Sequence, residues 1–264
     1  MSTPEPVGVI GGSGFYRLLT DPVARPVSTP YGDPSEPPAV GELAGRPVAF
    51  LPRHGADHRF APHVVPYRAN LWALRSLGVR QVVSLSAVGS LQAPVGIGSL
   101  VVPDQIIDRT WGREQTYFGD GAGVAHVSFA DPYCARGRAA ALTRRSARDG
   151  GTLVVINGPR FSTRAESAGF AAAGAVIIGM TAMPEATLAR ELGLCYTTLA
   201  LVTDLDAGIG AGTGVTHAEV LEQFAANLPR LRDLLVGTVQ HLPQTQGDCP
   251  CGDTSALPAS FRLP

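Results

Sequence analysis

The chain is 264 residues long, and 45% of its residues are hydrophobic while 16% are charged. Its 21 Lys and Arg balance 22 Asp and Glu, and no apolar run approaches the roughly 20 residues that a membrane span needs. Because the chain shows no basic excess, we expect neither a nucleic-acid nor a membrane partner. The polar first residues lack the layout of a signal peptide, which predicts a cytoplasmic protein.

Short apolar segments alternate with helical patterns along most of the chain. Strands or extended segments are expected at residues 7–10, 48–51, 81–86, 99–107, 152–156, 176–178 and 196–202, with a turn at 87–90. Helices are expected at residues 68–77, 132–149, 163–173, 184–192 and 216–241. This alternation predicts an α/β fold with a largely parallel or mixed central sheet flanked by helices.

Domain organisation is simple, because no linker or internal repeat divides the chain. We expect one domain over residues 1–243. Residues 244–264 are polar and rich in Pro and Gly, so we expect them to form a loosely held tail.

Two segments that follow predicted strands suit an anion. Gly12-Ser13-Gly14 is either a phosphate-binding loop or an ordinary tight turn, and Arg17 replaces the third glycine of a dinucleotide fingerprint. Arg53 and His54 offer a planar cation beside a group that can donate or shuttle a proton. A solvated surface loop is the alternative for this pair.

Three further segments suit a flat, polar ring. Phe161 can stack on a ring that Ser162 hydrogen-bonds, or it can fill the core. Met180-Thr181 also follows a strand. Asp204 and Asp206 follow a very apolar strand, so one carboxyl can be held protonated as a donor while the other accepts. A solvated turn is the alternative for these two.

Taken in order, the motifs closely resemble those of the methylthioadenosine phosphorylases, which belong to the trimeric branch of the purine nucleoside phosphorylase family. The resemblance runs from residue 7 to about residue 240. It rests on residues 11–16, 53–55, 67–74, 87–91, 104–110, 158–162, 179–181 and 184–185.

The resemblance implies a single phosphorylase/hydrolase-like α/β domain and a homotrimer or a dimer of trimers. It also implies inorganic phosphate as co-substrate and neither a metal nor an organic cofactor. By position, the phosphate ligands would be Ser13, Arg53, His54, Ser86, Ala87 and Thr181. The purine and ribose would meet Phe161, Ser162, Met180, Asp204 and Asp206, and a neighbouring subunit would lend His126 to the 5′ pocket.

The expected reaction is phosphorolysis of 5′-methylthioadenosine to adenine and 5-methylthioribose 1-phosphate. Phosphate held by Arg53 and His54 would stabilise the oxocarbenium-like sugar and attack C1′. Protonated Asp204 would donate to N7, and Asp206 would accept from a 6-amino group. Members that prefer 6-oxo bases carry glutamate in place of Ser162 and asparagine in place of Asp204, which favours adenine here.

Two departures from the family pattern concern the 5′ group. Ala207-Gly208 replaces bulky residues, and His217 stands where methylthioadenosine enzymes often place a small apolar residue. A histidine at this position bonds the 5′-hydroxyl in enzymes that act on ordinary nucleosides, although His217 could also lie on the surface. The alternatives are therefore adenosine, a 5′-modified 5′-deoxyadenosine, or a 6-oxopurine (methylthio)nucleoside.

The four cysteines are too few for a disulfide scaffold in a chain of this length. Cys249 and Cys251 are similar to a Cys-x-Cys found oxidised near the C-terminus of some archaeal methylthioadenosine phosphorylases. They could chelate a metal, but no second pair in the sequence completes a four-ligand set, so we expect no metal. We interpret them as part of a tail without function.

Overall fold

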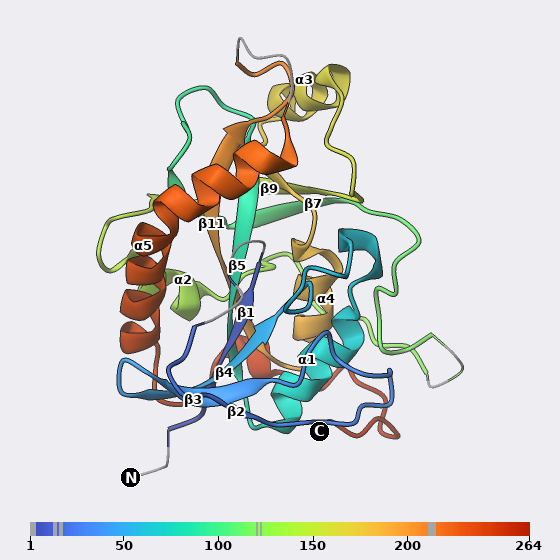
Figure 1. Ribbon diagram of the computed structural model, residues 1–264. Coiled ribbons are helices and arrows are strands. Elements are labelled where there is room, and N and C mark those ends of the chain that lie inside the picture. The colour runs from blue at the N-terminus through green and yellow to red at the C-terminus, as the bar shows by residue number, and fades with distance from the viewer. Residues whose placement is uncertain (1–3, 13–14, 16–17, 120, 122, 211–214) are drawn as a thin grey trace.

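The computed structural model describes residues 4–264 apart from residues 13, 14, 16, 17, 120, 122 and 211–214, and it consists of a twisted sheet between two layers of helices (Figure 1). The strands are β1 (Val7–Gly11), β2 (Val23–Ala24), β3 (Ala39–Leu43), β4 (Arg46–Pro52), β5 (Gln81–Ser90), β6 (Leu100–Val102), β7 (Gln105–Arg109), β8 (Arg148–Asp149), β9 (Thr152–Ile156), β10 (Ile177–Gly179) and β11 (Cys195–Leu205). The helices are η1 (Pro62–Val64), α1 (Tyr67–Ser76), α2 (Ala135–Leu142), α3 (Arg164–Ala172), α4 (Ala182–Glu191), α5 (His217–His241) and η2 (Pro250–Gly252). No helix of the described chain is both long and apolar enough to cross a bilayer.

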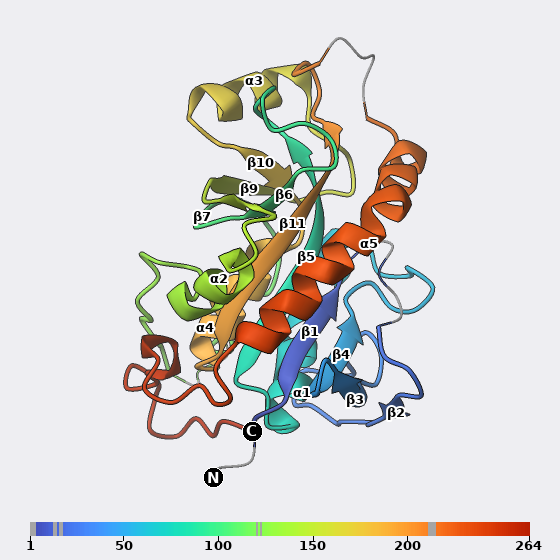
Figure 2. The ribbon, with the colours of Figure 1, turned by 90° about the vertical axis from the view of Figure 1, so that its left-hand side faces the viewer.

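The sheet is mixed, as the sequence predicts. Its order is β2-β3-β4-β1-β5-β10-β9-β7, and β11 branches from β5 toward β6 and β8. Strands β1 and β11 run parallel to β5, whereas β10 runs antiparallel to it. Figure 2 shows β5 and β11 side by side behind α5. The long central strand β5 therefore contacts most of the segments that carry the predicted motifs.

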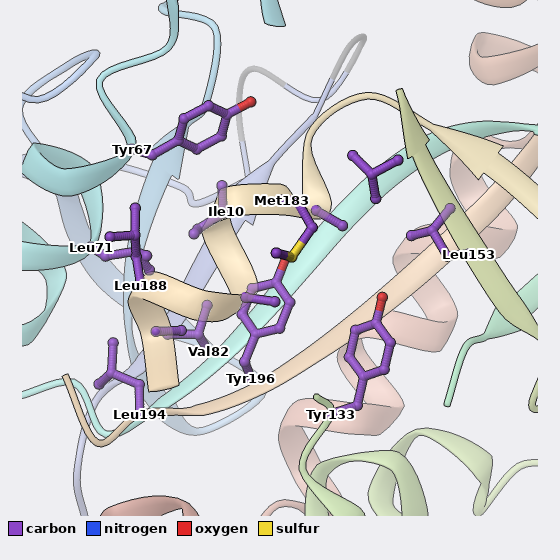
Figure 3. Close-up of a cluster of buried hydrophobic side chains, with 14 of the residues drawn as sticks. Ile10, Tyr67, Leu71, Val82, Tyr133, Leu153, Met183, Leu188, Leu194 and Tyr196 are labelled. Carbon is purple, nitrogen blue, oxygen red and sulfur yellow. The ribbon is translucent and has the colours of Figure 1, made fainter. Parts of the chain in front are cut away.

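Alternating side chains of β5 and β11 supply two cores, one on each face of the sheet. Leu199 and Leu201 face the core shared with α2 and α5. Ala200 and Val202 face the other core, which α1 and α4 cover. Figure 3 shows part of this second core, where Tyr196 lies near Met183. Both faces are thus closed by helices, which explains the nearly continuous apolar sequence of β11.

A bulge interrupts the pairing of β11 with β5, so the side chains beyond it change faces of the sheet. Val202 pairs with Val88, but Asp204 pairs with Gly89, so Thr203 is the extra residue. Strict alternation would place Asp204 on the face of Val202. The bulge instead places it on the opposite face, where an added Cβ at Gly89 would lie 2.8 Å from the Asp204 carboxylate.

Three expected elements are wrong in detail. The turn expected at 87–90 is the end of β5, because β10 and β11 pair with the strand there. The extended segment at 99–107 is divided into β6 and β7, and only part of 132–149 is helical, since β8 follows α2. Strand β3 was not expected at all, because its exposed and half-buried residues give no apolar pattern.

The C-terminal segment is not loosely held. The Phe261 ring lies 4.6 Å from Phe118 and 5.9 Å from Trp72, measured between ring centroids. Cys249 and Cys251 are buried beside Cys134 and Cys195. The expectation that no second pair of cysteines joins the Cys-x-Cys is therefore wrong, because the fold brings in two cysteines from distant segments.

Candidate active site

One cavity of about 410 Å³ contains nearly all of the predicted site residues. The predicted residues that line it are Arg53, His54, Ser86, Ala87, Phe161, Ser162, Met180, Thr181, Asp204, Asp206 and His217. Ser13 lies outside the described residues. His126 is exposed and does not line this cavity, so its contribution to a neighbouring subunit stays a prediction. The volume suits a ligand the size of a nucleoside with phosphate.

A buried cation, Arg53, forms one end of the cavity. It follows β4 and is 1% exposed, and its Nε and Nη2 donate to the Glu185 carboxylate at 2.7 and 2.9 Å. Nη2 also donates to Ser84 Oγ at 2.6 Å, and Nη1 donates to the Leu85 carbonyl at 3.1 Å. Within the described residues, these contacts use four of the five N–H groups that a guanidinium carries, which leaves one N–H on Nη1 for a ligand.

Glu185 on α4 fixes the charge state of this pair. Its Oε1 also accepts from Ser84 Oγ at 2.6 Å and from the Tyr196 hydroxyl at 2.7 Å. Burial alone would raise the pKa of Glu185, but the charge and hydrogen bonds of Arg53 outweigh it and hold that pKa below its usual value. Burial likewise opposes the charge of Arg53, and Glu185 more than compensates, so the net pKa of Arg53 is raised.

Hydroxyl groups of Ser86 and Thr181 line this end of the cavity. Ser86 Oγ is buried and has no hydrogen-bond partner among the described residues. Thr181 precedes α4 without capping it through its side chain. Gly12 closes the same end, and a Cβ there would lie 2.5 Å from the Leu85 carbonyl and 3.2 Å from Arg53 Nη1. A buried donor without a partner is costly unless a ligand satisfies it, so these groups suit an oxyanion such as phosphate.

His54 is neutral at physiological pH. Burial, followed by the charge of Arg53, lowers its pKa to about 4. Its Nδ1 lies 2.8 Å from the Phe60 carbonyl, which can only accept, so Nδ1 carries the proton. Nε2 is then unprotonated and can only accept a hydrogen bond. The sequence predicts a group that donates or shuttles a proton, and this geometry favours an acceptor, which suits the hydroxyl of a singly protonated phosphate.

Two carboxylates with different surroundings form the other end of the cavity. Asp206 is buried, and its Oδ2 accepts hydrogen bonds from Ser162 Oγ and, at 2.5 Å, from Ser167 Oγ. Its Oδ1 accepts none from the described residues. Asp206 is thereby held in one orientation with an acceptor oxygen to spare, which suits an amino group on a flat ring.

Asp204 is protonated more readily than an ordinary aspartate. Burial raises its pKa to about 6, the nearby Asp206 charge adds to this, and the 2.9 Å hydrogen bond from Thr203 opposes it. A carboxyl with this pKa can carry a proton into the cavity and donate it. Phe161 and Ser162 line the same region, which gives it an aromatic ring beside a pair of acids.

A comparison with known families decides where the chain belongs: the model of the phosphorylase superfamily matches residues 6–240. The chain belongs to this phosphorylase superfamily. It is 57% identical over 259 residues to the purine nucleoside phosphorylase of Streptomyces coelicolor, a match that covers 93% of this chain and 92% of the relative.

Further similarities extend this assignment. The chain is 54% identical over 259 residues to the S-methyl-5′-thioadenosine phosphorylase of Mycolicibacterium smegmatis, covering 98% of this chain and 99% of the relative. Its fold matches methylthioadenosine phosphorylase from Schistosoma mansoni in complex with adenine, with a TM-score of 0.85 and 38% identity over 89% of this chain and 91% of that one. The predicted family and fold are confirmed.

In this phosphorylase, histidines line a third part of the cavity. The rings of His54 and His58 stack with centroids 4.6 Å apart, and the His58 ring lies 5.7 Å from that of His217. Burial and the charge of His217 lower the pKa of His58. His217 begins α5 after a capping box formed by Thr216 and Glu219. This part of the cavity is therefore lined by polar imidazole rings and by the apolar side chain of Val220.

Four contributors to the site of the phosphorylase were not assigned roles from the sequence. Glu185 lies within a matched motif, but its partner Arg53 is 132 residues away. Ser167 lies inside α3, where a serine carries no special signal. Gly89 lies in β5 and leaves space for Asp204. His58 lies far from His217 in sequence, and the nearness of the two rings follows from the tertiary fold.

Proposed function

We propose that this chain is a nucleoside phosphorylase, a pentosyltransferase that cleaves 5′-methylthioadenosine with inorganic phosphate to give adenine and 5-methylthioribose 1-phosphate. The observation that carries the proposal is the polarity of one cavity. Arg53 and the Ser86 hydroxyl, which has no partner within the described part of the chain, lie at one end, and a protonatable Asp204 beside Asp206 lies at the other. Methylthioadenosine phosphorylases among the similar proteins support the choice of nucleoside.

The mechanism follows from where charge develops. Bond cleavage leaves positive charge on the sugar and negative charge on the purine. Phosphate near Arg53, Ser86 and Thr181 stabilises the sugar cation and attacks C1′, while neutral His54 accepts the phosphate proton in a hydrogen bond. Asp204 donates its proton to N7 of the leaving purine. Phosphate is the co-substrate, and the proposed chemistry uses no organic cofactor and no metal.

Base selection is assigned to Asp206. Its Oδ2 is occupied by two serine hydroxyls, so Oδ1 accepts from a 6-amino group. A 6-oxo base would bring a second acceptor toward this oxygen, which disfavours 6-oxopurine nucleosides. Phe161 stacks on the base, and Met180 packs against the ribose in this arrangement.

Adenosine is the second candidate substrate. His217 and His58 border the cavity, and an imidazole can hydrogen-bond a 5′-hydroxyl where a methylthio group offers only a weak acceptor. The similarity to a purine nucleoside phosphorylase supports this alternative. A 5′-modified 5′-deoxyadenosine is a third candidate for the same pocket.

The first test is to follow adenine release from methylthioadenosine and from adenosine, each with and without phosphate. Phosphate-dependent turnover that prefers methylthioadenosine supports the proposal, and a preference for adenosine selects the second candidate. Turnover without phosphate would refute phosphorolysis.

A second test examines the 5′ pocket. The substitution His217→Val should raise the ratio of kcat/KM for methylthioadenosine over adenosine about tenfold, which corresponds to about 1.4 kcal/mol for one hydrogen bond. The matched control His63→Val removes an exposed histidine outside the cavity and should leave the ratio unchanged. An unchanged ratio in His217→Val would show that His217 does not contact the 5′ group.

The assembly and location belong to the same proposal. We place the enzyme in the cytoplasm as a homotrimer or a dimer of trimers in which exposed His126 completes a neighbour's 5′ pocket. Light scattering after size exclusion measures the assembly. In mixed oligomers, Asp204→Ala subunits should restore activity to neighbouring His126→Ala subunits, because each variant supplies the group that the other lacks. No such cross-effect would place His126 outside the active site.

A further inference from the structure

Four cysteine side chains meet at one buried point away from the phosphorylase cavity. Their Sγ atoms all lie within 4.8 Å of one another, and Cys134 Sγ lies 3.7 Å from Cys249 Sγ. None of the four lines the nucleoside cavity. We propose that Cys134, Cys195, Cys249 and Cys251 bind one structural zinc ion, which fastens the C-terminal segment to the domain.

The spacing of the sulfur atoms fits a tetrahedral metal site better than a disulfide. Zinc–thiolate bonds of about 2.3 Å in a tetrahedron place neighbouring sulfurs about 3.8 Å apart. A disulfide needs about 2.05 Å between its sulfurs, which is much less than the 3.7 Å between Cys134 Sγ and Cys249 Sγ. Four thiolates satisfy zinc completely and leave no position for a substrate, which is the pattern of a structural site.

The backbone of three separate segments holds the cysteines in place. Cys134 is the N-cap of α2, and its own N–H donates to the Tyr196 carbonyl at 2.8 Å. Cys195 begins β11, where its N–H donates to the Arg80 carbonyl at 2.9 Å. Cys249 and Cys251 flank Pro250 at η2. Cys134 and Cys195 are therefore in position before any ion binds, whereas the turn in the C-terminal segment supplies the other two ligands.

Donors around the sulfurs favour the thiolate form. The Gly137 N–H donates to Cys134 Sγ at 3.4 Å, and Gln246 Nε2 donates to Cys195 Sγ at 3.4 Å. Hydrogen bonds from such outer groups orient metal ligands and tune the metal. The amino end of α2 also stabilises negative charge at Cys134. Soft sulfur ligands in a closed set select zinc over the hard cations.

The consequence for the fold is a cross-link between distant parts of the chain. The zinc ion would join the end of the chain to the start of both α2 and β11, because binding requires all three segments to be folded together. Gln246 reinforces this connection, since its Nε2 also donates to the Gly193 carbonyl at 2.8 Å. Zinc would therefore stabilise the folded tail without entering the chemistry of the cavity.

The test begins with the unmodified chain, purified without chelators. Metal analysis by inductively coupled plasma mass spectrometry should find one zinc per chain, and titration with an organomercurial should release it to a zinc-binding dye. Cobalt substitution should give the visible absorption bands of a tetrahedral thiolate site. Zinc removal should lower the midpoint of thermal unfolding.

Variants then assign the ligands. Cys134→Ser should lose the zinc while its hydroxyl still caps α2, so the helix start is preserved. Gln246→Ala should weaken zinc binding roughly 10- to 100-fold. The control Ser255→Ala, which changes an exposed side chain in the same segment, should keep one zinc per chain.

Three outcomes would overturn the proposal, and all can be read on the unmodified chain. An intact mass lowered by two or four hydrogens, with no metal, would identify disulfides instead. Four titratable thiols without metal would identify an empty thiol cluster. One equivalent of iron or copper in place of zinc would assign a different ion.

Discussion

Replacing Glu185 with glutamine would remove the negative charge opposite Arg53 while preserving the size of the side chain. Glu185 Oε1 accepts from Arg53, Ser84 and Tyr196, so the amide nitrogen would take the position of Oε2. There it would meet the Arg53 Nε–H, donor against donor. Breaking a buried ion pair costs about 3–5 kcal/mol, because the remaining charge stays buried without compensation.

Urea denaturation at fixed protein concentration measures this loss, and phosphate saturation kinetics measure its effect on the site. We expect Glu185→Gln to lower the free energy of unfolding by about 3–5 kcal/mol and to raise the KM for phosphate. Glu191→Gln is the matched control on the same helix. Glu191 is also buried, but it accepts only from neutral donors, Thr116 Oγ1 at 2.7 Å and the Tyr117 N–H at 2.8 Å.

The control Glu191→Gln should lose about 1–2 kcal/mol of the free energy of unfolding, since it disturbs only hydrogen bonds with neutral donors. Burial already raises the pKa of Glu191, so the loss of its charge costs little. The difference between the two variants isolates the charge of the Arg53 pair. If Glu185→Gln is no less stable than Glu191→Gln and binds phosphate normally, then the ion pair does not hold the phosphate end of the cavity.

Three further predictions follow from the same structure. Because Asp204 donates only when protonated and its pKa is about 6, kcat/KM should fall as the pH rises above about 6. The variant Asp204→Asn should not show this fall. A fall that persists in Asp204→Asn would belong to another group. His54 has a pKa of about 4 in the folded state and about 6.5 in the unfolded state, so its contribution to the free energy of unfolding is complete above pH 6.5 and should fall by about 3 kcal/mol as the pH drops to 4. The urea midpoint of His54→Gln should therefore vary less over this pH range. An equal loss of stability in His54→Gln would show that His54 does not cause the pH dependence. Phe261→Ala should cost about 2 kcal/mol and speed proteolysis of the tail, whereas the exposed control Arg262→Ala should do neither; an unaltered proteolysis rate for Phe261→Ala would show that the ring does not anchor the tail.

The site could largely be predicted from the sequence because its residues follow the strands. Arg53 and His54 come after β4, Met180 and Thr181 after β10, and Asp204 stands near the end of β11. The ends of β4 and β11 lie at one edge of the sheet because both strands run in the direction of β5, and antiparallel β10 ends beside the same part of β5, where Ile178 pairs with Gly89. Eleven of the thirteen predicted residues line one cavity for this reason.

Long-range partners could not be predicted in the same way. A capping box such as that of Thr163 and Glu166 joins residues three apart, so it can be recognised from the sequence alone. Glu185 pairs with Arg53 through the packing of α4 on the sheet, and nothing near either residue signals the other. Cys134 and Cys195 lie far from Cys249 in sequence, so their convergence required the fold. Gly89 resembled a turn residue, although its small size makes room for a carboxylate within a strand.

The bulge at Thr203 constrains how β11 can pair with β5. Regular pairing at unchanged chain length would set Thr203 opposite Gly89 and place Asp204 on the face that Val202 now occupies. A carboxyl group would then enter an apolar core and leave the cavity, so stability and activity would be lost in one step. Homologous chains with the same number of residues across this strand end should therefore keep the bulge.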